Sequence, residues 1–294
     1  MRSSNPVFSR RGFSRDNGYA GFNAAPQAGY AQGNPYAQGN PHAQGGNPYA
    51  SNPYAQQDQQ YGAPPQAPVT TGRMTMDDVV MRSAMTLGTV AVGAALAWAL
   101  LPVSTTSYGL AFVSAIIAMV LALVQSFKRT ASPALILGYA AFEGVFLGVI
   151  SEMYNSQWSG APFQAVLGTM AVSAATLLVY KAGWIRVTAR YARIGMAIAI
   201  AFVLVTAVNL LLVAFGVASD GGLRSFGPLG AIVGIIAILI GAFFLTLDFK
   251  QIEDGIAYGA PREEAWLAAF GLTLTLVWIY VEMLRLVAIF SNND

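Results

Sequence analysis

The sequence predicts an all-α integral membrane protein with seven transmembrane helices and a disordered N-terminal tail. Of its 294 residues, 55% are hydrophobic and 10% are charged, whereas a soluble domain has about 25% charged residues. The apolar stretches are about 20 residues long and do not alternate with polar residues, which favours helices over a membrane barrel. The composition changes near residue 74, so we divide the chain into a tail (1–73) and a membrane domain (74–294).

The tail is rich in Gly, Pro, Gln, Asn, Ala and Tyr and poor in Leu, Ile and Val. It repeats a short unit that begins with Asn-Pro, at residues 34–37, 40–43, 47–50 and 52–55. Asn-Pro pairs favour turns, and this composition cannot bury enough apolar surface to offset chain entropy, so we expect disorder. Two interpretations remain open: a solvated tail without a binding role, or a tail that binds partners or itself through its tyrosines.

The membrane domain contains seven apolar segments, each long enough to cross a bilayer. They lie at 83–101, 108–127, 133–154, 163–180, 194–217, 226–249 and 266–290. Before the first segment, Thr75 or Asp77 is suited to cap a short amphipathic lead-in helix. In the third segment Gly144 and Gly148 are four residues apart, and so are Gly230 and Gly234 in the sixth. Each pair places small residues on one helix face, which allows close backbone approach.

Two further polar residues have structural explanations. Glu152 lies near the outer end of the third segment, where we expect it at the membrane interface. Asn209 lies deep in the fifth segment, where an interhelical hydrogen bond would satisfy it.

The distribution of Lys and Arg predicts the orientation, because cytoplasmic loops carry an excess of them. Basic residues precede the first segment and follow the second, fourth and sixth, whereas the loops after the first and third have none and the loop after the fifth has only Arg224. The N-terminus is therefore expected in the cytoplasm and, after seven crossings, the C-terminus outside. A re-entrant seventh segment would instead return the C-terminus to the cytoplasm.

Several classes of function are disfavoured. The chain has no cysteine, and its one histidine, His42, lies in the tail. Disulfides, cysteine-based metal sites and histidine-based catalysis in the membrane are therefore excluded. The segments contain no Gly-x-Gly-Asp motif of intramembrane aspartic proteases, so we expect no enzyme and no cofactor. No dense basic patch is present, so nucleic acid is not an expected partner, while membrane lipids are.

The main functional candidates are acids inside apolar segments, since an acid in hydrocarbon costs about 2.5–3.5 kcal/mol. Asp248 lies near the inner end of the sixth segment, Glu282 in the seventh and Glu143 in the middle of the third. Arg285 follows Glu282 by three residues, so the two share a helix face and can form an ion pair. Both features also have interpretations without a function. The Glu282–Arg285 pair could serve only to stabilise the helix, and Asp248 could lie at the membrane interface beside Lys250.

In the functional interpretation, Asp248 and Glu282 approach each other. Two close carboxylates in a low dielectric cannot both ionise easily, so one takes up a proton and the pair responds to pH. When deprotonated, it offers oxygen ligands for weak calcium binding, as conduction requires. Glu282 lies sixteen residues beyond Trp266, about 24 Å along a straight helix. The acids therefore meet only if residues near Trp266–Gly271 lie along the membrane interface, or if the seventh helix is broken or tilted. Gly271 is a candidate break.

Three stretches resemble the Bax inhibitor-1 family, which includes the YccA-like and Lifeguard-type proteins. They are Leu-Asp-Phe-Lys-Gln-Ile at 247–252, Leu-Val-Trp-Ile-Tyr-Val-Glu-Met-Leu-Arg-Leu at 276–286 and Ala-Phe-Glu-Gly-Val-Phe-Leu-Gly at 141–148. The resemblance covers about residues 75–290. It implies seven helices with the last one central, and a pH-sensitive calcium leak gated by an acid pair, here Asp248 and Glu282. The family usually has Asp at the second position, and bacterial members are also linked to regulating membrane proteases.

The resulting hypothesis is a pH-sensitive cation leak channel or transporter, with calcium as the expected ion. Asp248 and Glu282 would form the pH-sensing ion pathway, and Glu143 and Arg285 would modulate it. The expected location is the bacterial inner membrane. The alternative is a non-conducting interaction protein that regulates a membrane protease or an envelope partner. Cation flux through the purified protein would discriminate between them.

Overall fold

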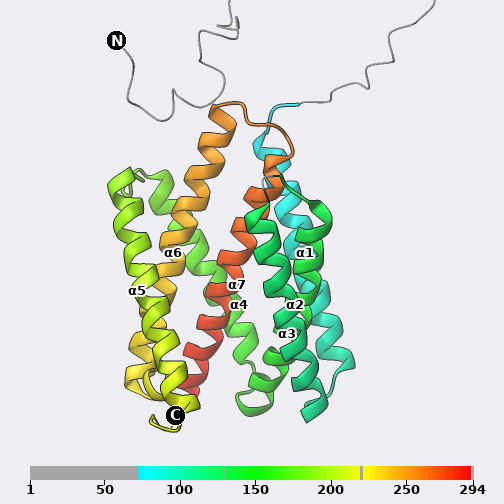
Figure 1. Ribbon diagram of the computed structural model, residues 1–294, viewed down its shortest axis with the longest axis vertical. Coiled ribbons are helices and arrows are strands. Elements are labelled where there is room, and N and C mark those ends of the chain that lie inside the picture. Colours follow the sequence, from blue (N-terminus) through cyan, green and yellow to red (C-terminus); the bar gives the residue numbers. More distant parts are fainter. Residues whose placement is uncertain (1–71, 129, 219–220, 293–294) are drawn as a thin grey trace, which may run out of the picture. The chain divides into compact units, whose positions relative to one another are not determined.

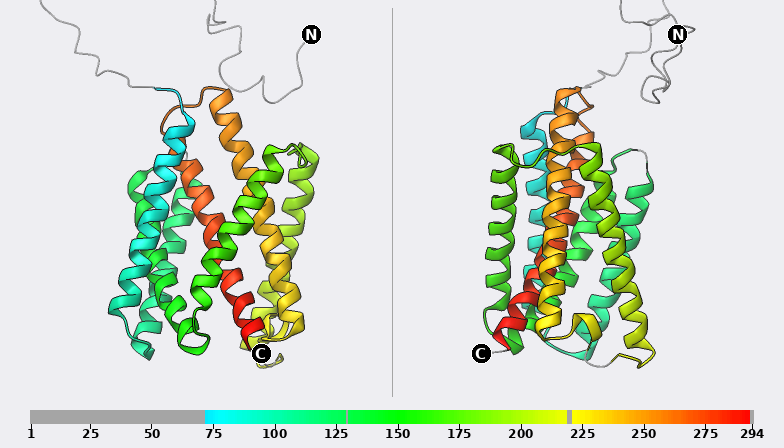
Figure 2. Two further views of the ribbon diagram at one scale, coloured as in Figure 1. Left: turned by 180° about the vertical axis from the view of Figure 1, so that it is seen from behind. Right: turned by 90° about the vertical axis from the view of Figure 1, so that its left-hand side faces the viewer.

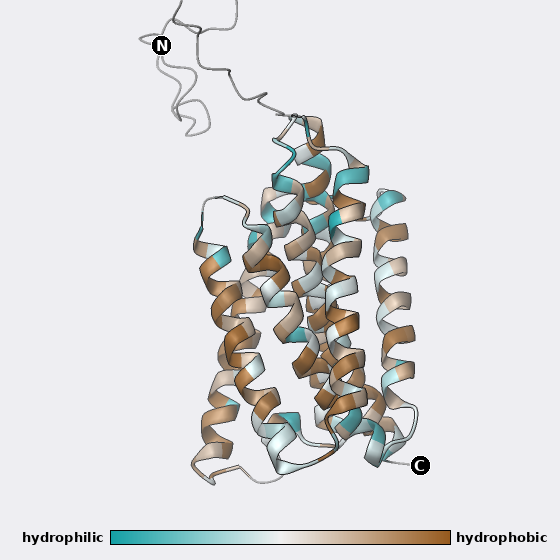
Figure 3. Cartoon of the chain, turned by 90° about the vertical axis from the view of Figure 1, so that its right-hand side faces the viewer, coloured by the Kyte–Doolittle hydropathy of each residue, from teal (hydrophilic) through white to brown (hydrophobic). Residues whose placement is uncertain are grey.

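The computed structural model describes residues 72–128, 130–218 and 221–292. In this part of the chain, seven helices are long and apolar enough to cross a membrane, which confirms the predicted fold class (Figure 1). Hydrophobic residues predominate along the middle of the helices (Figure 3). Almost all of the predicted disordered tail (1–73) lies outside the described residues, and its disorder stays a prediction.

The helices agree with the predicted segments but are longer at several ends. They are α1 (Met76–Leu100), α2 (Thr105–Phe127), α3 (Pro133–Gln157), α4 (Ala161–Lys181), α5 (Ala189–Ala214), α6 (Pro228–Ala257) and α7 (Glu264–Ser291), with a short 3-10 turn, η2 (Gly222–Arg224), between α5 and α6.

The start of α1 corrects one expectation. Thr75 caps α1 itself: its hydroxyl accepts from the Asp78 backbone N–H at 3.2 Å, and the Asp78 carboxylate accepts from the Thr75 N–H at 3.3 Å. This reciprocal arrangement is a capping box. Because no helix-breaking residue follows the cap, the expected lead-in helix is continuous with α1 rather than separate.

Helix α7 is central, as the resemblance implied. It packs against α6, α4, α1 and α3, and it runs obliquely between them (Figure 2). The proposed break at Gly271 is wrong, because α7 is helical without interruption from Glu264 to Ser291. It also runs from one end of the bundle to the other, which disfavours a re-entrant segment (Figure 1).

The predicted small-residue face of α3 is confirmed. A Cβ atom on Gly144 would lie 2.5 Å from the Val90 carbonyl oxygen, and one on Gly148 would overlap the Ala94 carbonyl oxygen of α1. Such backbone approach requires glycine. Gly234 of α6 instead makes room for an arginine side chain, as described below.

Basic side chains gather at one end of the bundle, which we call the basic end. It comprises residues 72–75 and the α2–α3, α4–α5 and α6–α7 connections (Figure 1). There Arg73 forms an isolated antiparallel bridge with Pro261, and the Met74 N–H donates to Ala260 O at 2.8 Å. The Arg262 side chain pairs with Asp78 at 2.6 Å. The chain entering α1 is therefore fastened to the α6–α7 connection.

Candidate functional site

Asp248 lies on α6, half-buried against α7. Its Oδ2 accepts a hydrogen bond from Thr275 Oγ1 at 2.7 Å. One turn earlier on α7, a Cβ atom on Gly271 would lie 3.1 Å from Asp248 Oδ1, so glycine permits this approach. Lys250, the expected neighbour of an interfacial Asp248, pairs with Asp254 at 2.8 Å instead. Among the described residues, Asp248 forms no ion pair.

Glu282 lies on α7 and is 4% exposed. Its Oε1 accepts from Arg224 Nη2 at 2.6 Å, and its Oε2 accepts from Arg285 Nη2 at 3.2 Å. The i,i+3 pair with Arg285 was predicted from the sequence. Arg224 was missed as a partner because it had been assigned only to a loop, 58 residues away in the chain.

The structure does not bring Asp248 and Glu282 together. The residue that faces Asp248 is Thr275, and Glu282 lies seven residues further along α7, about 10 Å on a continuous helix. Helix α7 runs obliquely but without a break at Gly271, and along it the two acids have different partners: Thr275 for Asp248, and Arg224 and Arg285 for Glu282. The acid pair implied by the family resemblance is therefore not assembled in this conformation.

Arg285 is buried and its guanidinium is surrounded by acceptors. Besides Glu282, Nη1 donates to Arg224 O and Nη2 donates to Gly230 O, each at 3.3 Å. A Cβ atom on Gly234 would lie 3.2 Å from Nη2. The glycine face of α6 thus provides both space and a carbonyl for the charge, as buried cations in membranes require.

Asn209 of α5 holds the η2 turn in place. Its Nδ2 donates to Gly221 O at 3.1 Å, and its Oδ1 accepts from the Leu223 N–H at 2.7 Å. The predicted interhelical hydrogen bond is therefore a bond from a helix to a loop. Consequently the α5–α6 connection folds into the end of the bundle opposite the basic end, and Arg224 points to Glu282.

Glu143 lies near the middle of α3 and lines a cavity of about 450 Å³. The same cavity is lined by Tyr139, Trp278, Arg224 and Glu282. Glu143 forms no hydrogen bond or ion pair with any described residue, in contrast to Glu282. The cavity thus joins two of the predicted site residues, Glu143 and Glu282.

A larger cavity contains none of the predicted acids. It measures about 730 Å³ and its walls come mainly from apolar residues of α1, α3, α4 and α7, with a Ser151–Tyr280 hydrogen bond of 2.6 Å on one side. Glu152, expected at the interface, is half-buried, and its Oε2 is buried without a hydrogen-bond partner in the described part of the chain.

Residues 72–128, 130–218 and 221–292 contain no group of three or more acidic or histidine side chains that could hold a metal ion. Asp248 and Glu282, the predicted weak calcium ligands, do not share a site. In the described part of the chain, a metal ion would therefore meet these two carboxylates one at a time, at different levels of the bundle.

A bundle of seven apolar helices, with α7 at its centre and a buried Glu282–Arg285 pair, defines a helical integral membrane protein. The chain belongs to the Bax inhibitor 1 like family, whose model matches residues 5–292. The match extends into the tail, which the sequence resemblance had left out. A comparison with curated proteins gives no match.

Proposed function

We propose that the protein is a cation leak channel or transporter, with calcium as the expected ion, and that Asp248 makes it sensitive to protons. The observation that carries this proposal is the Asp248 carboxylate, which lies within a membrane helix and has a hydroxyl rather than a cation as its partner. Acids in such positions typically belong to ion or proton pathways. The family assignment supports the same function.

Glu282 has a different role in this proposal from the one that the sequence suggested. Arg224 and Arg285 neutralise it and add positive charge at the end of the bundle opposite the basic end. Fixed positive charge raises the barrier to cations. We therefore assign Glu282 and Arg285 to closing the pathway, with Asp248 as a separate proton-responsive group.

The proposed location is a bacterial inner membrane with the basic end in the cytoplasm, as the excess of Lys and Arg favours. The proposal involves no enzymatic reaction and no cofactor. The partners are membrane lipids and the permeating cation.

The test is calcium flux through the purified protein in liposomes between about pH 6 and pH 8, where a buried carboxylate can titrate. The variant is Asp248→Asn, and its matched control is Asp77→Asn, which changes an exposed Asp in the first turn of α1. We expect flux that depends on pH in the wild type and the control, and flux that no longer depends on pH in Asp248→Asn. A wild-type pH response in Asp248→Asn would refute its role as the sensor.

Flux no greater than that of empty liposomes at every pH would refute the leak itself. It would favour the alternative, a non-conducting protein that regulates a membrane protease or an envelope partner. In that case, the phenotype of a chain without residues 1–73 would show whether the tail binds the partner.

A further inference from the structure

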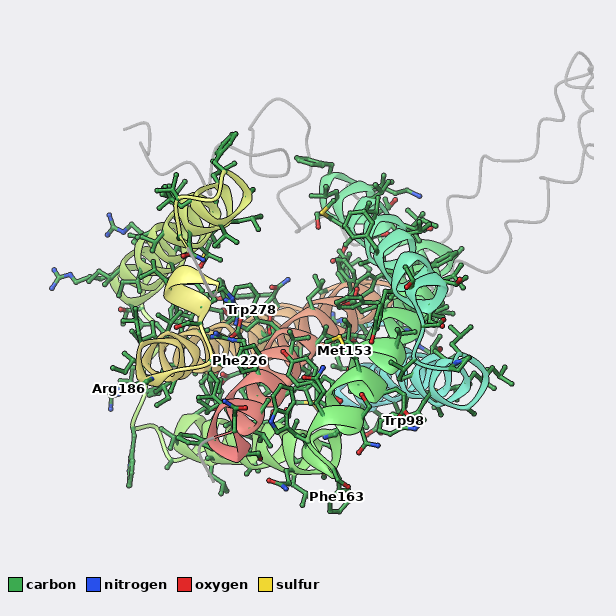
Figure 4. All side chains as sticks on the ribbon, turned by 90° about the horizontal axis from the view of Figure 1, so that it is seen from below. Trp98, Met153, Phe163, Arg186, Phe226 and Trp278 are labelled. Carbon is green, nitrogen blue, oxygen red and sulfur yellow. The ribbon has the colours of Figure 1, made fainter. Side chains whose placement is uncertain are left out.

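The cavity beside Glu143 lies between two helices that do not contact each other. Its walls come from α2, α3, α5, α7 and the η2 turn. Among the described elements, α2 packs against α3, while α5 packs against α6 and η2. Viewed along the bundle from the end opposite the basic end, α2 and α5 stand apart, with Trp278 beside the space between them (Figure 4). The cavity therefore opens sideways, between two helices.

The opening between α2 and α5 faces the lipid. Outside the cavity lining, α2 and α5 carry exposed large apolar side chains, including Phe112, Val205 and Leu212. In a bilayer these side chains lie in hydrocarbon. A molecule that dissolves in the membrane can therefore reach the cavity between these two helices.

The charge on the cavity wall selects the sign of the ligand. Glu282 pairs with both Arg224, at 2.6 Å, and Arg285, at 3.2 Å, so its carboxylate already has counter-ions. Glu143 is the acid in the wall with no described partner. A carboxylate in an apolar wall is costly without a counter-ion, so a bound cation would stabilise it.

Two aromatic residues of the cavity lining also favour a cation. Tyr139 is one turn from Glu143 on α3, and its ring packs edge-on against Phe270 at 5.4 Å. Trp278 is fixed by a hydrogen bond from Nε1 to Ala237 O of 3.0 Å. Both residues line the cavity, and faces of aromatic rings attract organic cations.

Size and ligand chemistry distinguish an organic cation from calcium. The cavity of about 450 Å³ falls in the range of small-molecule sites, about 300–1,000 Å³. Calcium requires about six to eight oxygen ligands, and of the two carboxylates in this wall Glu282 is already paired with arginines, which leaves Glu143. We propose that the cavity between α2 and α5 binds a lipophilic organic cation from the membrane, with Glu143 as its counter-ion. This proposal does not depend on the leak.

The test is equilibrium binding of labelled tetraphenylphosphonium to the full-length protein in lipid nanodiscs, with empty nanodiscs subtracted. Tetraphenylborate, an anion of the same shape, measures hydrophobic binding that does not depend on the sign of the ligand's charge. We expect saturable binding of the cation alone. Glu143→Gln should weaken that binding about tenfold or more, because a buried counter-ion is lost. The matched control, Glu263→Gln, changes an exposed glutamate at the start of α7 and should bind as the wild type does.

A second variant decides the question even if Glu143→Gln fails to fold. Ala115→Phe fills the cavity from α2 and leaves Glu143 in place, so it should also abolish saturable binding. Equal binding of tetraphenylborate would overturn the proposal, as would full cation binding by folded Glu143→Gln or by folded Ala115→Phe. Absence of saturable cation binding to the wild type would overturn it as well.

Discussion

Arg285 shows how single residues accommodate charge inside this bundle. The residue is 7% exposed, and the acceptors of its guanidinium come from α7, the η2 turn and the glycine face of α6. A buried ion pair is weak evidence for net stability, but removing one partner leaves an uncompensated charge. The pair with Glu282 therefore has a measurable consequence.

Glu282→Gln should lower the free energy of unfolding by about 3–5 kcal/mol, because two arginines lose their counter-ion. The measurement is thermal unfolding in detergent, followed by tryptophan fluorescence. The double variant Glu282→Gln/Arg285→Met should regain part of the loss, since it removes one of the stranded charges. Glu263→Gln serves as the exposed control, and a Glu282→Gln protein as stable as this control would contradict the prediction.

At this scale, the sequence predicts local pairs better than distant ones. The i,i+3 relation of Glu282 and Arg285 follows from helix geometry, whereas the contact between Glu282 and Arg224 depends on how a loop folds back. The partner of Asp248 was likewise missed: Thr275 is one of several hydroxyl residues in α7, and nothing local distinguishes it. Glu143 was recognised because it lies in the middle of an apolar segment. The cavity beside it could not be predicted, because its walls come from five separate elements.

Helix pairs show why certain glycines are required in this chain. The α1–α3 contact depends on Gly144 and Gly148, where a Cβ atom would meet backbone atoms of α1. Backbone atoms cannot rotate away as a side chain can, so the helices would have to separate. By contrast, a Cβ atom on Gly88 of α1 would meet nothing within 4 Å.

Gly148→Ala should therefore destabilise the protein by about 1–3 kcal/mol through overpacking. Gly88→Ala, the same change on an exposed helix face, should be neutral or slightly stabilising, because Ala is the better helix former. Thermal unfolding of the two variants side by side tests this difference. Equal unfolding temperatures would show that α1 and α3 can move apart at no cost.

The errors at the level of elements have physical reasons. The segments were delimited by hydropathy, which ends where polar residues begin, whereas the helices continue to their capping residues. Thus α1 begins at Met76 rather than at 83, and α6 continues to Ala257 rather than ending at 249. Gly271 suggested a break in α7, yet its role is to let Asp248 approach.

The basic loops of the bundle lie at one end. The number of helices and this placement of the basic loops are the features that the sequence predicts best. Helix number follows from the apolar segments, and loop charge follows from composition, so neither requires knowledge of side-chain contacts. The basic loops alternate with loops that carry at most one basic residue. In the structure they lie at one end (Figure 1).

Orientation can be measured because the chain has no cysteine. Ser159→Cys places a thiol in the α3–α4 connection, and Trp184→Cys places one in the α4–α5 connection at the basic end; both positions are exposed. In intact bacterial cells, a membrane-impermeant maleimide should label only Ser159→Cys. Trp184→Cys should react only after permeabilisation, because the basic end faces the cytoplasm. The reverse pattern would invert the proposed orientation.

The bridge at the basic end gives the protein a mechanical property. Met74 donates to Ala260, Arg262 donates to Gly72, and the Arg262 side chain pairs with Asp78. Tension applied to the chain ahead of residue 72 would load these bonds before it could unwind α1. Part of the force would pass through the α6–α7 connection to the start of α7, so a pull on the N-terminal segment would act on the helix that carries Thr275 and Glu282.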